Sequence, residues 1–247
     1  MKKIFAANWK LNKSPNEARQ FLNELSQKIS SVDLKNHQLI LFPSALSVDA
    51  CLNQAKDIGV SIGIQNSYFQ ANGAFTGENS ASVAKEMGCQ FVLIGHSERR
   101  SIFAETDSQC QKKISYVQSL GLTPMLCIGE VLAERQNGQT FAVLKNQLHL
   151  ALKEIDSAKP IVIAYEPVWA IGTGQVATVE QVRETHAMIH AELLSMGFQN
   201  VPLLYGGSVK ADNAGELSRI PHVDGFLIGG ASLQVDSYLA IVQASLT

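Results

Sequence analysis

The 247-residue chain has few charges, and none of them form a block of one sign. Charged residues make up 17% of the sequence, and 20 lysines and arginines stand against 22 aspartates and glutamates, for a formal net charge of −2. Proteins that bind nucleic acid or an anionic membrane through charge carry a basic patch, and no such run is present. Because 46% of the residues are hydrophobic, the chain can bury a large core and is not disordered. We expect a globular protein with a small-molecule partner.

Clustered cysteines and long apolar runs are also missing. The four cysteines form no C-x-x-C pair, so their spacing favours buried thiols over a zinc site or a redox pair. The N-terminal segment reaches Asn8 and Lys10 before a secretory apolar region could form, and no later run approaches the length of a membrane span. We therefore expect a cytoplasmic protein without a bound metal.

Short apolar runs alternate with helical segments along the whole chain. Helix starts are marked by capping boxes at residues 14–17 and 178–181, and helix stops by glycines that each precede an apolar run. The stops are Gly59, Gly88, Gly121 and Gly197. The candidate strands are residues 4–7, 39–42, 60–64, 91–94, 124–128, 161–165, 201–205 and 226–228.

This alternation indicates parallel strands joined by crossover helices. Eight such units in a chain of 247 residues favour a closed barrel over an open doubly wound sheet. An open sheet would be expected to carry G-x-G-x-x-G after its first strand, whereas here Asn8-Trp9-Lys10 follows, which weakens a dinucleotide-binding interpretation. No linker divides the chain. The sequence predicts an α/β fold, a single-domain (β/α)8 TIM barrel over residues 1–247.

In a parallel barrel the active site lies at the carboxyl ends of the strands. The residues that follow the apolar runs are few in type: Asn8 and Lys10, His96 and Glu98, Glu166, Gly206-Gly207-Ser208, and Gly229-Gly230. Small residues at strand-to-helix turns let backbone N–H groups approach an anion, which favours a phosphorylated ligand. Alone, Lys10 would be a solvated amine and His96 a structural histidine. Together these residues fit proton abstraction next to a carbonyl.

Glu166 ends an apolar strand and precedes a segment that begins with proline and ends with glycine. The intervening large apolar side chains suit a lid that excludes water. A surface turn with a solvated glutamate is the simpler alternative, since such loops need Pro and Gly for geometry alone. The predicted lid segment comprises Pro167, Val168, Trp169, Ala170, Ile171, Gly172 and Thr173.

Five motifs between Asn8 and Leu233 closely resemble the triosephosphate isomerase family in its bacterial form. They are N-W-K at 8–10, G-H-S-E-R-R at 95–100, A-Y-E-P-V-W-A-I-G-T-G at 164–174, Y-G-G-S-V at 205–209 and G-G-A-S-L at 229–233. The long central motif is highly specific. The resemblance implies a glycolytic and gluconeogenic enzyme that interconverts dihydroxyacetone phosphate and D-glyceraldehyde 3-phosphate without metal or organic cofactor.

The resemblance also assigns roles to the residues. It makes Glu166 the base and His96 a neutral electrophile, kept uncharged by a helix N-terminus. Lys10 would supply a fixed positive charge and Asn8 a hydrogen bond, both also contacting the substrate, while Glu98 would orient Lys10 or relay protons. The expected phosphate ligands, besides Asn8 and Lys10, are Gly172, Ser208, Gly229 and Gly230.

The long loop at 65–78 receives a role only from the resemblance. In the family this loop inserts into a second subunit, which implies a homodimer. The expected interface residues are Gln65, Thr76, Gly77, Glu78 and Arg99. Three positions depart from the family's common pattern, with Ala104 in place of glycine and Gln175 and Gln234 in places often held by lysine.

Two alternatives differ in class. Another sugar-phosphate barrel enzyme, such as a Schiff-base aldolase, would need its lysine at a later strand end, desolvated, so Lys10 is badly placed. A noncatalytic phosphate-binding barrel remains possible because fold alone does not determine function. The combination of Glu166, His96 and Lys10 argues against it, since a binding module needs no base.

Overall fold

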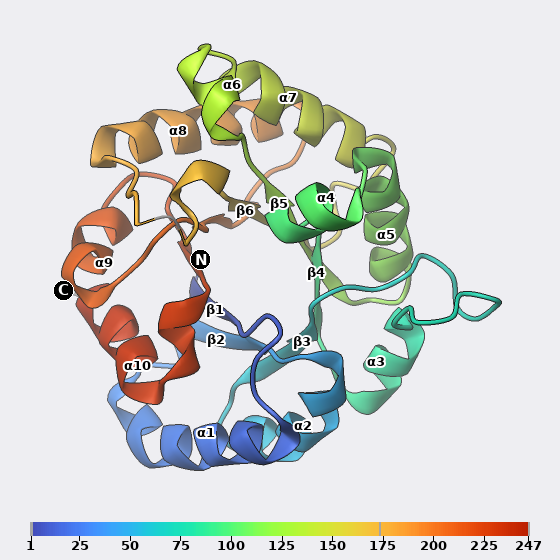
Figure 1. Cartoon of the computed structure of the whole chain (residues 1–247), viewed down its shortest axis with the longest axis vertical. Helices are drawn as coiled ribbons and strands as arrows, with labels where there is room; N and C mark the ends of the chain where they lie inside the picture. The colour runs from blue at the N-terminus through green and yellow to red at the C-terminus, as the bar shows by residue number, and fades with distance from the viewer. Residues whose placement is uncertain (1, 173, 247) are drawn as a thin grey trace.

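The strands close into a ring with the helices outside it. A computed structural model describes residues 2–172 and 174–246, and its eight parallel strands follow one another around a closed barrel in chain order (Figure 1). β1 closes the ring by pairing with β8, with Ile4 opposite Gly225. The strands are β1 (Lys3–Asn8), β2 (His37–Phe42), β3 (Ser61–Ile64), β4 (Phe91–Ile94), β5 (Thr123–Ile128), β6 (Val162–Tyr165), β7 (Leu203–Tyr205) and β8 (Gly225–Ile228).

Helices cross between successive strands and form the outer layer. They are α1 (Pro15–Lys28), α2 (Val48–Asp57), α3 (Ala81–Met87), α4 (Ser97–Phe103), α5 (Asp107–Ser119), α6 (Leu132–Gln136), α7 (Thr140–Ala151), α8 (Val179–Ser195), α9 (Ala211–Ser218) and α10 (Val235–Ala244). Short 3-10 turns add η1 (Ile29–Ser31), η2 (Ala45–Ser47), η3 (Val168–Ala170) and η4 (Gly230–Leu233). The predicted (β/α)8 barrel is confirmed.

The predicted strands are confirmed with small shifts at their amino ends. The largest shifts are of two residues, in β2, which begins at His37 and not at Leu39, and in β7, which begins at Leu203 and not at Val201. Pro202 has no N–H to donate to a sheet, although its carbonyl accepts a bond from Ile163 N at 3.0 Å. The carboxyl ends matter more for function, and there β4 and β6 stop directly before the Gly95-His96 and Glu166 segments.

The predicted helix boundaries are confirmed both at the capping boxes and at the stop glycines. Ser14 and Glu17 form a reciprocal capping box on α1, and Thr178 and Gln181 form another on α8. The four predicted stop glycines all have positive φ, the conformation that a helix-terminating residue without a Cβ adopts readily. A third box, Thr106 with Gln109 on α5, has the same T-x-x-Q spacing and was not predicted.

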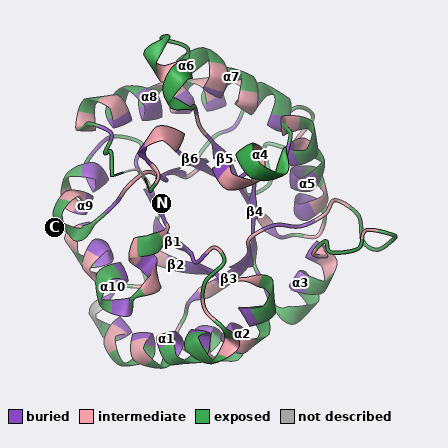
Figure 2. Cartoon of the chain, in the orientation of Figure 1, coloured by how far each residue is buried: buried purple, intermediate pink, exposed green. Residues whose placement is uncertain are grey.

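Two apolar layers result from the alternation of side chains along each strand. Phe5 and Ala7 of β1 face the helices, and Ile4 and Ala6 face the barrel interior. The interior is filled by side chains from the ring of strands, including Phe42, Leu93, Met125, Ala164, Leu204 and Leu227. Figure 2 shows the strands and the inward helix faces buried. The barrel is therefore a packed core whose rim alone is open to ligands.

Candidate active site

Glu166 and His96 face each other at the carboxyl rim of the barrel. Glu166 follows β6 and His96 follows β4, and Glu166 Oε1 lies 3.0 Å from His96 Nε2. Glu166 Oε2 accepts a hydrogen bond from the backbone N–H of Ser97 at 2.9 Å. Relative exposure is 2% for Glu166 and 5% for His96. Such burial of a carboxylate and an imidazole is typical of an acid–base site.

The hydrogen bonds around His96 define its tautomer. His96 is the N-cap of α4, and its Nδ1 accepts the backbone N–H of Glu98 at 3.2 Å. An Nδ1 that accepts cannot itself carry a proton, so the proton resides on Nε2 and is donated to Glu166. The ring thus presents an N–H donor to the centre of the site.

Burial and the neighbouring charges act in opposite directions on the two groups. Burial by itself would raise the pKa of Glu166, but His96, the Ser97 N–H and Lys10 together bring this pKa below its ordinary value. For His96, burial lowers the pKa and the adjacent Glu166 carboxylate raises it, with the carboxylate prevailing. Glu166 is therefore a carboxylate, and the His96 pKa depends on where that carboxylate lies.

Lys10 is held in a strained backbone conformation. Its φ is +53°, a region that non-glycine residues seldom adopt and that is often found at functional sites. The Asn8 Oδ1 accepts the Lys10 N–H at 3.0 Å, and Gln65 Nε2 donates to the Lys10 carbonyl at 2.8 Å. Lys10 Nζ lies 2.6 Å from Glu98 Oε1. The structure thus places Glu98 where it can orient Lys10.

All the predicted phosphate ligands except Asn8 line one cavity. Lys10, Gly172, Ser208, Gly229 and Gly230 all contribute to a cavity of about 250 Å³. Its size fits a small anionic group, and its glycines leave backbone close to the ligand space. Four segments that lie far apart in the sequence therefore border one cavity, and Asn8 borders a second cavity that shares Lys10 with it.

The described part of the lid segment is anchored by Glu130. Trp169 Nε1 donates to Glu130 Oε1 at 3.0 Å, and Val168 N donates to the Glu130 carbonyl at 3.1 Å. Arg135 lies over the Trp169 ring at 5.4 Å. Gly172 has a φ of +68°, and Thr173 lies outside the described residues. The first half of the segment is thus tied to the loop after β5.

Comparison with known proteins adds to this geometry. The sequence profile of the triosephosphate isomerase family matches residues 3–245. The chain is 55% identical to triosephosphate isomerase of Bdellovibrio bacteriovorus, a match that covers 98% of this chain and 99% of that protein.

The chain belongs to the triosephosphate isomerase family. It is also 42% identical to triosephosphate isomerase of Francisella tularensis subsp. mediasiatica, over 98% of this chain and 96% of that one. The crystal structure of triosephosphate isomerase from Bartonella henselae superposes with a TM-score of 0.90 at 35% identity, covering 100% of both chains. The protein is therefore an aldose–ketose isomerase that interconverts dihydroxyacetone phosphate and D-glyceraldehyde 3-phosphate.

Two residues of this isomerase have contacts that sequence reasoning missed. Gln65, predicted only as an interface residue, also holds the backbone of Lys10 and donates to the Phe42 carbonyl at 2.9 Å. Glu130, which anchors Trp169, is fully buried. A signal was present for Glu130, because it follows β5 by two residues, a carboxylate at a strand end like Glu166.

The loop at 65–78 projects away from the barrel between β3 and α3 (Figure 1). Within the chain, Glu78 accepts a hydrogen bond from Asn66 at 3.3 Å, and Arg99 pairs with Glu105 at 2.6 Å. A cavity of about 480 Å³ is lined by Lys10, His96, Gln65, Gly77, Glu78, Arg99 and other residues. Lys10 and His96 thus border one hollow with all the predicted interface residues except Thr76.

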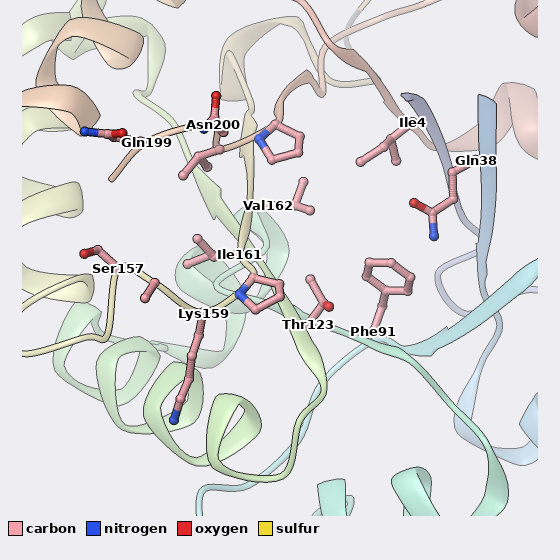
Figure 3. A pocket seen from close by; sticks show the side chains of 14 residues that line it. Ile4, Gln38, Phe91, Thr123, Ser157, Lys159, Ile161, Val162, Gln199 and Asn200 are labelled. Atoms are coloured by element: carbon pink, nitrogen blue, oxygen red, sulfur yellow. The ribbon is translucent and has the colours of Figure 1, made fainter. Parts of the chain in front are cut away.

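A cavity at the opposite end of the barrel differs in its chemistry from those at the carboxyl rim. It measures about 510 Å³ and is bordered by Ile4, Gln38, Phe91, Thr123, Lys159, Asn200 and neighbours (Figure 3). The described residues that line it include no carboxylate and no imidazole. Its volume is close to the 480 Å³ of the hollow at the carboxyl rim, so cavity size alone does not distinguish the two ends.

The described residues contain neither a metal-binding cluster nor a membrane-spanning helix. Between residues 2–172 and 174–246, no group of three or more histidine, cysteine, aspartate or glutamate side chains is arranged to hold a metal ion. In the same ranges, no helix is long and apolar enough to cross a membrane.

Proposed function

We propose that Glu166 is the base and His96 the electrophile of the isomerisation. The observation that carries this assignment is the contact of 3.0 Å between the Glu166 carboxylate and His96 Nε2. This buried pair lies beside Lys10, which also lines the small cavity of the phosphate ligands. A base, an N–H donor and a fixed cation then surround one substrate position.

In this mechanism Glu166 removes a proton from the carbon next to the substrate carbonyl. His96 Nε2–H donates to the carbonyl oxygen as negative charge develops, which gives an enediolate. Glu166 then returns the proton to the neighbouring carbon. Oxidation and reduction occur within one substrate molecule, so the reaction needs no electron carrier, and we propose that the enzyme works without a cofactor.

The substrate changes the electrostatics of His96. Burial and Lys10 lower the His96 pKa, and the Glu166 carboxylate raises it. When Glu166 leaves His96 to take the substrate proton, the contribution that favours imidazolium is lost. The Glu98 N–H at Nδ1 also opposes a second ring proton. We infer that His96 acts as a neutral imidazole.

Lys10 and Asn8 stabilise the developing negative charge. The strained Lys10 backbone directs Nζ toward the rim, where Glu98 fixes it at 2.6 Å. Asn8 uses its oxygen for the Lys10 N–H, so its side-chain nitrogen is the donor for the substrate. Because these groups are already oriented, little reorganisation is required in the transition state.

The phosphate group is bound by Gly172, Ser208, Gly229 and Gly230 together with Lys10. Closure of the lid segment would bring the Gly172 N–H to the phosphate and place Ile171 over the substrate. Exclusion of water suppresses loss of phosphate from the enediolate. Thr173 belongs to this proposal as part of the lid segment, although the structure does not describe it.

We further propose that residues 1–247 form one domain, and that the enzyme is a homodimer in the cytoplasm, where it serves glycolysis and gluconeogenesis. Support for the dimer comes from the projecting 65–78 loop and from nearby exposed apolar side chains, including Leu11 at 96% and Phe103 at 65% exposure. In a dimer, Thr76, Gly77 and Glu78 of one subunit would occupy the hollow near Arg99 of its partner. Sedimentation that gives an active monomer would contradict this arrangement.

The assignment of the base is tested with Glu166→Gln, which keeps the size of the side chain and removes its basicity. Isomerisation of D-glyceraldehyde 3-phosphate is coupled to NADH-dependent reduction of dihydroxyacetone phosphate. We expect kcat to fall by about 10²–10⁴-fold. The control is Glu154→Gln, at a side chain that is 78% exposed, with kcat unchanged. Equal rates for both variants would contradict the role of Glu166, and a folded wild type without activity would favour the noncatalytic barrel or another phosphorylated substrate.

A further inference from the structure

Arg100 joins three segments behind the active site with one guanidinium group. The residue lies on α4, and its side chain is 16% exposed. Its Nε donates to the Gly95 carbonyl at 2.7 Å, its Nη2 to the Cys127 carbonyl at 3.1 Å, and its Nη1 to Asp107 Oδ1 at 2.6 Å. The planar guanidinium has N–H donors that point in several directions, which suits three acceptors on different segments.

The two carbonyls belong to positions where a strand pair comes apart. β4 and β5 pair from Phe91 with Thr123 to Ile94 with Leu126. Gly95 and Cys127 are the next residues on each side, so the guanidinium connects the two chains just beyond the last pair. It therefore fixes the spacing of these strand ends at the rim that bears the chemistry.

On the β4 side, this clamp acts directly on the backbone of His96. Gly95 precedes His96 and has a φ of +69°. A Cβ at Gly95 would lie 2.9 Å from both Arg100 Nη2 and Cys110 Sγ, so the peptide is packed closely against the guanidinium. A rotation of the Gly95 carbonyl would turn the following residue and displace its imidazole.

On the β5 side, the clamp reaches the strand that bears the base. Cys127 is followed by Ile128, whose carbonyl accepts the backbone N–H of Glu166 at 2.7 Å. We propose that Arg100 is a positioning residue that sets the His96 imidazole relative to Glu166 for the isomerisation. This inference rests on the roles proposed above for His96 and Glu166.

The geometry favours positioning over a direct effect of charge on the substrate. Arg100 is not among the described residues that line either of the two cavities at the carboxyl rim. Its charge is also paired with Asp107. The guanidinium therefore acts on the site by fixing the positions of two backbone carbonyls.

The test compares Arg100→Lys with Asp107→Asn. Lysine keeps the charge, but its single nitrogen cannot reach two carbonyls and a carboxylate together. We expect kcat to fall by about 10–100-fold in Arg100→Lys, with KM for D-glyceraldehyde 3-phosphate and the inhibition constant of inorganic phosphate within about threefold, because the phosphate ligands are elsewhere. Asp107→Asn leaves both carbonyl contacts in place and should retain kcat within about twofold.

A double-mutant cycle with His96→Asn separates positioning from general loss of structure. If Arg100 acts through His96, Arg100→Lys should cost less than about threefold in kcat once His96 is already replaced. Equal losses in both backgrounds would overturn the proposal. A loss of kcat of about tenfold or more in folded Asp107→Asn would also overturn it, and this arm stands even if Arg100→Lys does not fold. Full activity of His96→Asn alone would instead refute the role proposed for His96.

Discussion

The two ends of the barrel differ in what they bury. At the carboxyl end, ionisable side chains with 2% and 5% exposure, Glu166 and His96, contact each other, and the cavities at this rim measure about 480 and 250 Å³. At the amino end a cavity of about 510 Å³ has a single charged side chain on its border, Lys159. Cavities of similar size therefore lie at both ends, and the buried carboxylate and imidazole lie at the carboxyl end. Buried charge, more than volume, identifies the active end of this fold.

The largest effect expected from this comparison follows from replacing one lysine at each end of the barrel. Lys10→Met removes a cation that is fixed near the developing oxyanion, and we expect kcat/KM to fall by about 10³-fold. Lys159→Met removes a cation from the border of the amino-end cavity and should leave kcat/KM within about twofold. Steady-state assays of both variants at one ionic strength measure the difference, and similar losses would break the distinction between the two ends.

Titration toward the amino end should affect stability. His186 is fully buried on α8, and its Nδ1 lies 2.9 Å from the carbonyl of His222, just before β8. Burial lowers its pKa from 6.5 to about 4. Between these values the unfolded chain binds a proton that the native chain does not, so stability decreases as pH falls.

The contribution of His186 to the pH dependence of stability can be measured with His186→Phe. A shift of this size corresponds to about 2 kcal/mol of stability lost by the wild type between about pH 7 and pH 4.5. Denaturant unfolding of both proteins across this range gives the comparison, and the variant should show a correspondingly smaller pH dependence. Parallel curves would mean that His186 does not titrate as its burial implies.

A pair of glycines tests the lid segment against a loop remote from the site. Gly172 and Gly138 have φ values of +68° and +69°, and an added Cβ would meet nothing within 4 Å at either position. Valine should therefore strain both backbones alike. We expect Gly172→Val to lower kcat/KM by about tenfold, whereas Gly138→Val should lose similar stability and keep its activity. Native turnover in Gly172→Val with native melting would contradict the role of the lid.

The fold and the site differ in how far the sequence predicts them. Strand ends and the capping boxes at Ser14 and Thr178 depend on local pattern, so they were predictable. The contacts of Gln65 with Lys10 and of Glu130 with Trp169 join segments 55 and 39 residues apart. No local rule indicates these pairings, although the position of Glu130 after β5 marks the residue itself. Motif resemblance supplied the candidate catalytic residues but not the hydrogen bonds that orient them.

The smallest expected effect concerns a departure from the family pattern that the structure explains. Ala104 ends α4 with φ +53° and ψ +34°, a left-handed conformation in which alanine is less stable than glycine. Part of the gain from glycine is offset by its greater freedom in the unfolded chain.

We therefore expect Ala104→Gly to raise the free energy of unfolding by about 0.5–1 kcal/mol without changing kcat. Ala191→Gly, on the exposed face of α8, is the matched control and should lower stability by about 1 kcal/mol. Urea unfolding at one protein concentration compares the two, since the same substitution should have opposite signs at the two positions. A loss of stability in both variants would show that contacts of the Ala104 methyl group outweigh the strain of its left-handed backbone. In that case Ala104 would stabilise the carboxyl end of α4.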